Sequence, residues 1–308
     1  MSPAQTLRLP APAKLNLYMR IDGLRPDGYH DLETLFERID LADELTFALR
    51  PDHLRLTCDD PALDCGSGNL VLKAARLLQE ATGCRQGASL HLIKRIPIAA
   101  GLGGGSSDAA TTLIGLNIMW RLELGADQLH SLAAQLGSDV AFFLSRRAYA
   151  IGRGRGERLE EVDGGFPTLC HVIVAPQDRL STKDVYAEWA AQESLTAPAP
   201  SITIPLHALR NGSVDELAKG LWNDLGPAAI RRCPVMQEVH TLLRASEPVG
   251  TLVSGSGSAI FGLYRSRSLA QQAAAWLRGR CPADWRIDVA ATRHAPVTTT
   301  QDPSPSQH

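Results

Sequence analysis

The sequence predicts an α+β protein of two domains. Three observations support this class. Apolar and alternating runs typical of strands occur beside segments whose apolar residues recur at helical spacing. A cluster of turn residues at 162–167 (VDGGFP) interrupts the chain, and a buried strand is expected directly after it. Of the 308 residues, 44% are hydrophobic, which is enough to bury a sizeable core.

The expected elements of the first domain are strands joined by turns, followed by helices. Turns at 22–23 and 26–28 separate the first strands, and Gly83 and Gly137 end two of the helices. The elements are strands at 15–19, 34–36, 44–49 and 89–93, helices at 69–82, 107–122 and 126–136, and an apolar run at 140–144.

The second domain is expected to hold a buried strand, two helices and a second loop of glycine and serine. Three prolines among small residues at 195–205 predict an exposed connection, not a core element. The strand is expected at 168–175, the helices at 235–244 and 269–278, and the loop at 253–261, where it runs into a further strand. We place the domains at 1–163 and 164–295, with a disordered tail at 296–308.

Charge and composition argue against several functional classes. The 31 basic and 33 acidic residues give a formal net charge of -2, with no basic footprint for nucleic acid and no polybasic segment for a membrane. Neither a signal-peptide pattern nor an apolar stretch of roughly 20 residues is present, so a cytoplasmic location is expected. The six cysteines are scattered without a CxxC pair, which favours reduced thiols over a zinc site or a disulfide framework.

The stretch 97–110, PIAAGLGGGSSDAA, lies between a predicted strand and a predicted helix and indicates a phosphate-binding loop. No lysine follows the glycines, which excludes a Walker A loop, and Ser106 stands where a dinucleotide fingerprint needs its third glycine. With these two loop types excluded, the loop is expected to hold phosphate through its backbone amides, which lie at the positive end of the following helix. A flexible linker is the alternative. Asp108 either caps the helix or acts at a metal ion.

Several blocks of the chain resemble the galactokinase, homoserine kinase, mevalonate kinase and phosphomevalonate kinase (GHMP kinase) superfamily. Its phosphate loop is approximately P-x-x-x-G-L-G-S-S-A, and this sequence has Pro97, Gly101, Leu102, Ser106 and Ser107 in that pattern. The extra glycines of GLGGGSS are similar to the branch that phosphorylates 4-diphosphocytidyl-2-C-methyl-D-erythritol. Further blocks follow in the order of that branch, over about residues 10 to 290: PAKLNL at 12–17, RPDGYH at 25–30, LGSDV at 136–140, ST at 181–182 and VSGSG at 253–257. The departures from the branch are Ala100, Ser138 and Tyr186.

The resemblance implies a two-domain GHMP kinase fold with the active site in the cleft between the domains, and ATP with Mg²⁺ as cofactors. It implies phosphorylation of the 2-hydroxyl of the cytidine-diphosphate-linked methylerythritol in the non-mevalonate isoprenoid pathway. Asp139 would be the general base, and Lys14 would orient the pair and stabilise the acceptor oxygen. Taken alone, Lys14 would be a solvated surface amine and Asp139 a turn or cap residue.

The same resemblance implies a set of ATP-binding residues: Asn69, Leu70, Lys94, Pro97, Ile98, Ala99, Ala100, Gly101, Leu102, Gly103, Gly104, Gly105, Ser106, Ser107 and Asp108. Asn69 could equally be a helix N-cap and Lys94 a solvated strand end. The sequence has no cluster of ligands with dedicated metal spacing, so Mg²⁺ is expected to arrive with the nucleotide. The second loop, 254–257, is expected to lie against the first, with a simple turn as the alternative.

The implied substrate-binding residues are Asn16, Tyr29, His30, Thr182 and Tyr186. Tyr29 and Tyr186 would sandwich cytosine while His30 binds the edge of the base, although isolated tyrosines are usually packing groups. The expected partner is a small-molecule substrate, with no nucleic acid and no membrane, and the expected state is a monomer or weak homodimer. Two alternatives stay open: another small-molecule kinase of the superfamily, and a non-catalytic relative that binds a ligand.

Overall fold

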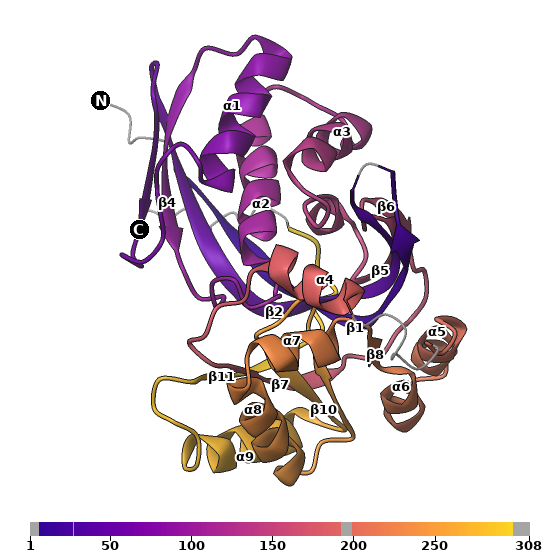
Figure 1. Cartoon of the computed structure of the whole chain (residues 1–308). Coiled ribbons are helices and arrows are strands. Elements are labelled where there is room, and N and C mark those ends of the chain that lie inside the picture. Colours follow the sequence, from indigo (N-terminus) through magenta and orange to yellow (C-terminus); the bar gives the residue numbers. More distant parts are fainter. Residues whose placement is uncertain (1–5, 27, 192–198, 298–308) are drawn as a thin grey trace, which may run out of the picture.

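Two long antiparallel strands, β1 (Thr6–Leu24) and β2 (His30–Arg50), form the centre of the larger sheet (Figure 1). The computed structural model describes residues 6–26, 28–191 and 199–297. The sequence predicts three short strands here, at 15–19, 34–36 and 44–49. This prediction is wrong, because proline and glycine residues that look like strand breaks lie at bulges within longer strands. The pairing register shifts beside Pro12 and beside Gly23, so both residues stay within one continuous strand.

The larger sheet runs in the order β3-β4-β2-β1-β8, with β5 pairing with β2 and with β6. Its other strands are β3 (Leu54–Cys58), β4 (Gly87–Ile93), β5 (Tyr149–Gly154), β6 (Arg158–Glu161) and β8 (Trp222–Asn223). Helices α1 (Leu70–Thr82), α2 (Gly104–Met119) and α3 (Ala126–Leu136) pack together, and α1 and α2 lie side by side over one face of this sheet (Figure 1). Buried apolar side chains such as Phe47, Leu78 and Leu113 fill the space between helices and sheet.

A smaller antiparallel sheet, in the order β11-β7-β10-β9, forms the lower part of the molecule in Figure 1. Its strands are β7 (Cys170–Ala175), β9 (Gly250–Val253), β10 (Ile260–Tyr264) and β11 (Arg286–Ala291). The helices of this half are α4 (Thr182–Ala190), α5 (Thr203–Arg210), α6 (Val214–Gly220), α7 (Gly226–Arg232), α8 (Val235–Ala245) and α9 (Arg267–Arg278). The two sheets with their helices confirm the α+β class.

Local signals account for the helices that the sequence predicts well. Helix α1 begins after Asn69, whose side chain accepts from the Val71 amide, and ends at Gly83 in the left-handed region. The bounds of α3 match the prediction, and those of α8 and α9 lie within two residues of it. Helix α2 begins three residues early, because the left-handed Gly103 is its N-cap. The apolar run at 140–144 is a short 3-10 helix, η1 (Ala141–Leu144).

The proline-rich segment departs from its prediction. Residues 192–198 lie outside the described residues, but Ile202 and Pro205 are buried and Thr203 begins α5. Proline is tolerated in the first turn of a helix, because the amide it lacks has no partner there. Ile202 and Pro205 therefore belong to the core, contrary to the predicted exposed connection, whereas Ser201, Thr203 and Ile204 are exposed.

The predicted domain boundaries stay a prediction. Strand β8 comes from the second half of the chain yet pairs in parallel with β1 of the larger sheet. The predicted tail at 296–308 falls, from residue 298 on, outside the described residues. None of the helices in the described part of the chain is long and apolar enough to cross a membrane.

A buried polar cluster joins the two sheets. His171 Nε2 on β7 lies 2.9 Å from Glu37 Oε2 on β2, and both side chains are fully buried. The Thr292 hydroxyl donates to Glu37 Oε1 at 2.7 Å and lies 3.0 Å from the Tyr149 hydroxyl. Because a buried carboxylate is costly without partners, this cluster fixes the two sheets relative to each other.

His171→Ala should destabilise the protein by about 3–5 kcal/mol, because it removes one partner of a buried carboxylate. Urea unfolding followed by circular dichroism measures this change. The control is Arg265→Ala, which removes an exposed ion pair with Asp215 and should cost no more than about 1 kcal/mol. Equal losses in the two variants would contradict the role assigned to the buried cluster.

Candidate active site

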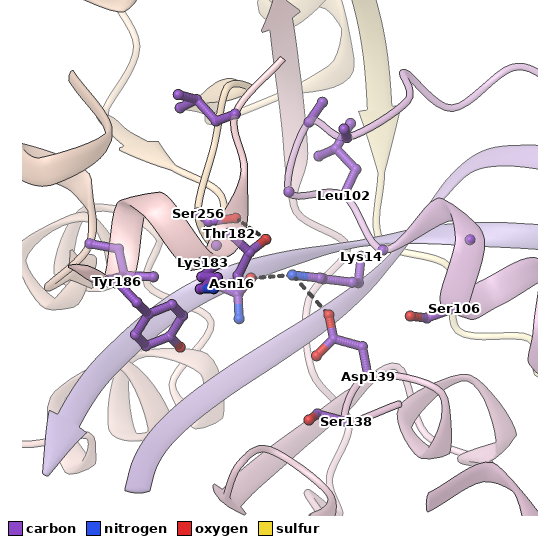
Figure 2. Close-up of a pocket in the computed structure, with 18 of the residues that line it drawn as sticks. Lys14, Asn16, Leu102, Ser106, Ser138, Asp139, Thr182, Lys183, Tyr186 and Ser256 are labelled. Carbon is purple, nitrogen blue, oxygen red and sulfur yellow. Dashed lines mark hydrogen bonds and ion pairs between the residues drawn. The ribbon is translucent and has the colours of Figure 1, made fainter. Parts of the chain in front are cut away.

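A cavity of about 1100 Å³ lies where the glycine-rich loop, the start of α2, strands β1 and β2 and helix α4 meet. Figure 2 shows Lys14 and Asn16 of β1 directed toward each other, with Asp139 pointing at Lys14 and Tyr186 of α4 on the other side of Asn16. The cavity collects the predicted site residues, with one exception. Ser107 is fully buried, its amide donates to the Gly103 carbonyl within α2, and it does not line the cavity.

The glycine-rich loop lies directly against the second loop, as the sequence predicts. The Ser254 hydroxyl donates to the Gly101 carbonyl at 3.0 Å, and the Ala259 amide donates to the Ala100 carbonyl at 3.1 Å. Gly101 has a φ of 79°, and a Cβ there would lie 2.0 Å from the Ser254 carbonyl oxygen. The close contact therefore requires glycine at this position.

The loop also supplies free backbone amides at the start of α2. Gly103 is the N-cap with a φ of 70° and has no side chain to cap the helix. Gly104, Gly105 and Ser106 follow on the cavity wall. The first amides of a helix have no partner within it and carry the positive end of its dipole, so this wall is suited to an anion such as phosphate.

Lys14 and Asp139 form a charged pair in the cavity (Figure 2). Lys14 Nζ lies 3.5 Å from Asp139 Oδ2 and donates to Asn16 Oδ1. The Lys14 side chain is 4% exposed, whereas that of Asp139 is 31% exposed and open to the cavity. Burial lowers the pKa of Lys14, and the charge of Asp139 opposes this shift. The alternative that Lys14 is a solvated surface amine is thus wrong.

Asn16 is held from both sides. Its Nδ2 donates to the Thr34 hydroxyl at 2.8 Å, and its backbone amide lies 3.4 Å from the Ser254 hydroxyl. The amide oxygen is therefore directed at Lys14. This network links β1, β2 and the second loop around a single ammonium group.

A second buried ammonium lies beside the loop. Lys94 Nζ pairs with Asp43 Oδ2 and lies 3.1 Å from Asp108 Oδ2. Burial acts to lower the pKa of Lys94, but the two carboxylates outweigh it and raise the pKa. Burial raises the pKa of Asp108 to about 7. Lys94 is therefore no solvated strand end, and Asp108, in the second turn of α2, is no helix cap, since Gly103 occupies that position.

Aromatic rings form the far wall of the cavity. His30 stacks on Tyr186 with ring centroids 5.0 Å apart and meets Trp189 edge-on at 5.5 Å. Tyr29 is more than half exposed and lies under the Arg155 guanidinium at 4.9 Å. The structure therefore brings His30 and Tyr186 together, while Tyr29 lies against a different residue, and the cytosine sandwich stays a prediction.

The remaining predicted residues also line the cavity. The Thr182 hydroxyl, at the first residue of α4, lies 2.9 Å from the Ser256 hydroxyl. Asn69 caps α1 through its Oδ1, which accepts from the Val71 amide, and its Nδ2 donates to the Asp64 carbonyl. Both polar atoms of its side chain therefore have partners within five residues along the chain. Leu70 also lies on the cavity wall.

The sequence analysis missed three residues at or beside the cavity: Asp43, Arg155 and Lys183. Lys183 adjoins the predicted Ser181-Thr182 pair, but Asp43 and Arg155 lie in no motif that would have indicated them.

Comparisons with known proteins show the family of the chain. The model described as the GHMP kinases N terminal domain matches residues 69–147, and that of the GHMP kinases C terminal matches residues 206–283. A 4-diphosphocytidyl-2-C-methyl-D-erythritol kinase of Citrifermentans bemidjiense is 39% identical over 270 residues, which cover 87% of this chain and 93% of that protein. The chain belongs to this kinase branch of the GHMP family.

Solved structures place this GHMP kinase in the same group. The crystal structure of a 4-(cytidine 5'-diphospho)-2C-methyl-D-erythritol kinase has a TM-score of 0.76 and 38% identity, covering 92% of this chain and 98% of that one. The L. major mevalonate kinase in complex with R-mevalonate has a TM-score of 0.75 at 15% identity, covering 96% of this chain and 99% of that one, which supports the fold alone. The chain is therefore a kinase, and the resemblance found in its motifs is confirmed.

Gly101→Ala in this GHMP kinase should lower the free energy of unfolding by at least about 2 kcal/mol, because the new Cβ has no space and φ is positive. The matched control is Gly105→Ala, whose Cβ would meet Leu70 Cδ1 at 3.6 Å, an ordinary contact. That variant should be unchanged or more stable by up to about 1 kcal/mol. Urea unfolding compares the two, and similar values would refute the close contact at Gly101.

Proposed function

We propose that this GHMP kinase transfers the γ-phosphoryl group of ATP to the 2-hydroxyl of 4-diphosphocytidyl-2-C-methyl-D-erythritol. The observation that carries the proposal is the Lys14–Asp139 pair, which lies in one cavity with the glycine-rich loop and the aromatic wall. The proposed reaction needs a loop that holds the phosphates of the donor, a base for the acceptor hydroxyl and a surface for the planar base of the acceptor. The reaction would supply a phosphorylated intermediate of the non-mevalonate isoprenoid pathway.

Asp139 would accept the proton of the attacking hydroxyl. The acceptor oxygen forms a bond to the γ-phosphorus, the bond from that phosphorus to the bridging oxygen breaks, and ADP leaves with the electron pair. The Asp139 carboxylate is partly exposed to the cavity, where an acceptor can reach it. Lys14, held by Asn16 and Asp139, would orient the base and stabilise negative charge on the acceptor oxygen.

The glycine-rich loop would hold the phosphates of ATP. The amides at the start of α2 and the absence of side chains at Gly103, Gly104 and Gly105 fit an anionic ligand that approaches the backbone closely. Among the described residues, no group of three or more His, Cys, Asp or Glu side chains could hold a metal ion. Mg²⁺ would therefore be bound mainly through the nucleotide phosphates and water.

The aromatic wall would bind cytosine. The side chains of His30, Tyr186 and Trp189 give a stacking surface together with ring nitrogens that can bind the edge of a base. Burial raises the pKa of Tyr186, and the charge of Asp139 adds to this shift, which fits an uncharged phenol beside the reaction site. The proposal also includes a cytoplasmic location and a monomer or weak homodimer.

Asp139→Asn should lower turnover by about 10²- to 10⁴-fold, because the amide cannot accept the proton. Substrate binding should stay within a few-fold of the unchanged protein. Steady-state ATP turnover and calorimetric binding measure the two effects. Asp127→Asn, an exposed carboxylate change on α3, is the control and should leave both unchanged. Near-normal turnover in Asp139→Asn would rule out the role of general base.

Cytidine diphosphate should inhibit turnover competitively against the acceptor, because it carries the base that the aromatic wall binds. Tyr186→Ala should weaken this inhibition by about tenfold or more, with the KM for ATP nearly unchanged. Initial rates at varied acceptor and inhibitor concentrations give the inhibition constants. Competition by sugar alcohol phosphates without competition by cytidine diphosphate would point to another small-molecule kinase of the family.

A further inference from the structure

Asp43 is a buried carboxylate on β2 that belongs to none of the sequence motifs. Its Oδ1 accepts two backbone hydrogen bonds, from the Arg95 amide at 2.5 Å and from the Ile96 amide at 2.7 Å. Its Oδ2 pairs with Lys94 Nζ. The side chain is fully buried, so these partners replace the water that the charge has lost. Asp43 therefore holds both the backbone and the ammonium of the segment that leads into the glycine-rich loop.

The Lys94 ammonium lies at the start of α2, where a cation is unfavourable. A Cβ on Gly104 would lie 2.9 Å from Lys94 Nζ, so the ammonium is directly beside the loop that is suited to phosphate. The helix dipole repels a cation at this end. The carboxylates of Asp43 and Asp108 compensate for that cost, and a bound phosphate would do so as well.

The two carboxylates hold Lys94 in different ways. Asp43 is held by three partners, two of them backbone amides. Asp108 Oδ2 lies 3.1 Å from Lys94 Nζ, and Asp108 Oδ1 has no hydrogen-bond partner. Asp108 lies on the cavity wall, and Asp43 lies behind it. An anion that enters the cavity therefore competes with Asp108 for Lys94 but leaves the contact to Asp43 in place.

We propose that Asp43 is a positioning residue of the nucleotide site, which anchors the Lys94 ammonium so that it exchanges Asp108 for the phosphates of the nucleotide. The proposal rests on the proposed function, because it takes the anion to be ATP. Asp43 acts through Lys94 and does not touch the nucleotide. Asp108 acts as a competitor that occupies Lys94 in the free protein.

Two substitutions, Asp43→Asn and Asp108→Asn, test the proposal, because each converts one carboxyl group beside Lys94 to an amide of the same size. Asp43→Asn should weaken ATP binding by about 10- to 100-fold, the loss of a charge-assisted hydrogen bond that orients Lys94. Asp108→Asn should leave ATP binding unchanged or tighten it by up to about tenfold, since it removes the competitor. Calorimetric titration with ATP and Mg²⁺, without acceptor, measures both constants.

Two controls isolate the contact with the ammonium. Asp59 Oδ1 accepts from the Lys94 backbone amide at 2.7 Å without touching Nζ, so Asp59→Asn should change ATP binding by no more than about twofold. In a Lys94→Ala background, Asp43→Asn should have no further effect, because the group that it positions is gone. Urea unfolding of each variant confirms that the fold is retained. If Asp43→Asn does not fold, Asp43→Glu replaces it with the same expected loss.

Any outcome other than weaker ATP binding in Asp43→Asn together with unchanged or tighter ATP binding in Asp108→Asn contradicts the proposal. Weaker binding in both variants means that the cluster only maintains the fold, and tighter binding in both means a simple charge effect. A full loss from Asp43→Asn in the Lys94→Ala background shows that Asp43 does not act through Lys94. If the unchanged protein does not bind ATP, the proposed function fails, whereas normal ATP binding without these differences contradicts the role of Asp43 alone.

Discussion

The contact between two backbone loops determines the rest of the site. Gly101 lies so close to the Ser254 carbonyl that no side chain fits between them, and Ser254 donates to the Gly101 carbonyl. The Lys14 amide donates to the Leu102 carbonyl of the same loop at 3.0 Å. Because one loop lies against both β1 and the second loop, the start of α2 and the charged pair have fixed relative positions. Such positioning is what phosphoryl transfer requires from a protein.

The charges of the site are local and paired. The chain as a whole has a formal net charge of -2, so its overall field attracts no polyanion. Lys14 and Lys94 are both buried, and carboxylates lie within 3.5 Å of each ammonium. The two carboxylates raise the pKa of Lys94 despite its burial, whereas burial lowers the pKa of Lys14 and Asp139 opposes this shift. The two lysines thus give one cavity two separate positive groups, although the protein as a whole is not basic.

Motifs and end signals explain what could be predicted from the sequence. The Asn69 cap and Gly83 set the bounds of α1, and the glycine-rich loop and LGSDV identify one side of the cavity and the charged pair's carboxylate. The two long strands were not predictable from local pattern, because proline and glycine usually end a strand and here lie at bulges. Asp43 gives no local signal either, since its partners lie about fifty residues away in the chain. The length of the two strands and the partners of Asp43 both depend on tertiary pairing, which the local pattern of a single sequence does not show.

The pairing of β1 with β8 has a consequence for synthesis of the chain. The Ile21 amide donates to the Asp224 carboxylate across 203 residues, and the Asp224 amide returns a bond to the Met19 carbonyl. At about 5–20 residues per second, a ribosome needs roughly 10 to 40 s to make the intervening chain. During that time the outer edge of β1 at Tyr18 and Met19, which β8 covers in the folded protein, has no native partner and can pair with other chains. Nascent chains of this kinase therefore expose this part of the edge until most of the protein has been made.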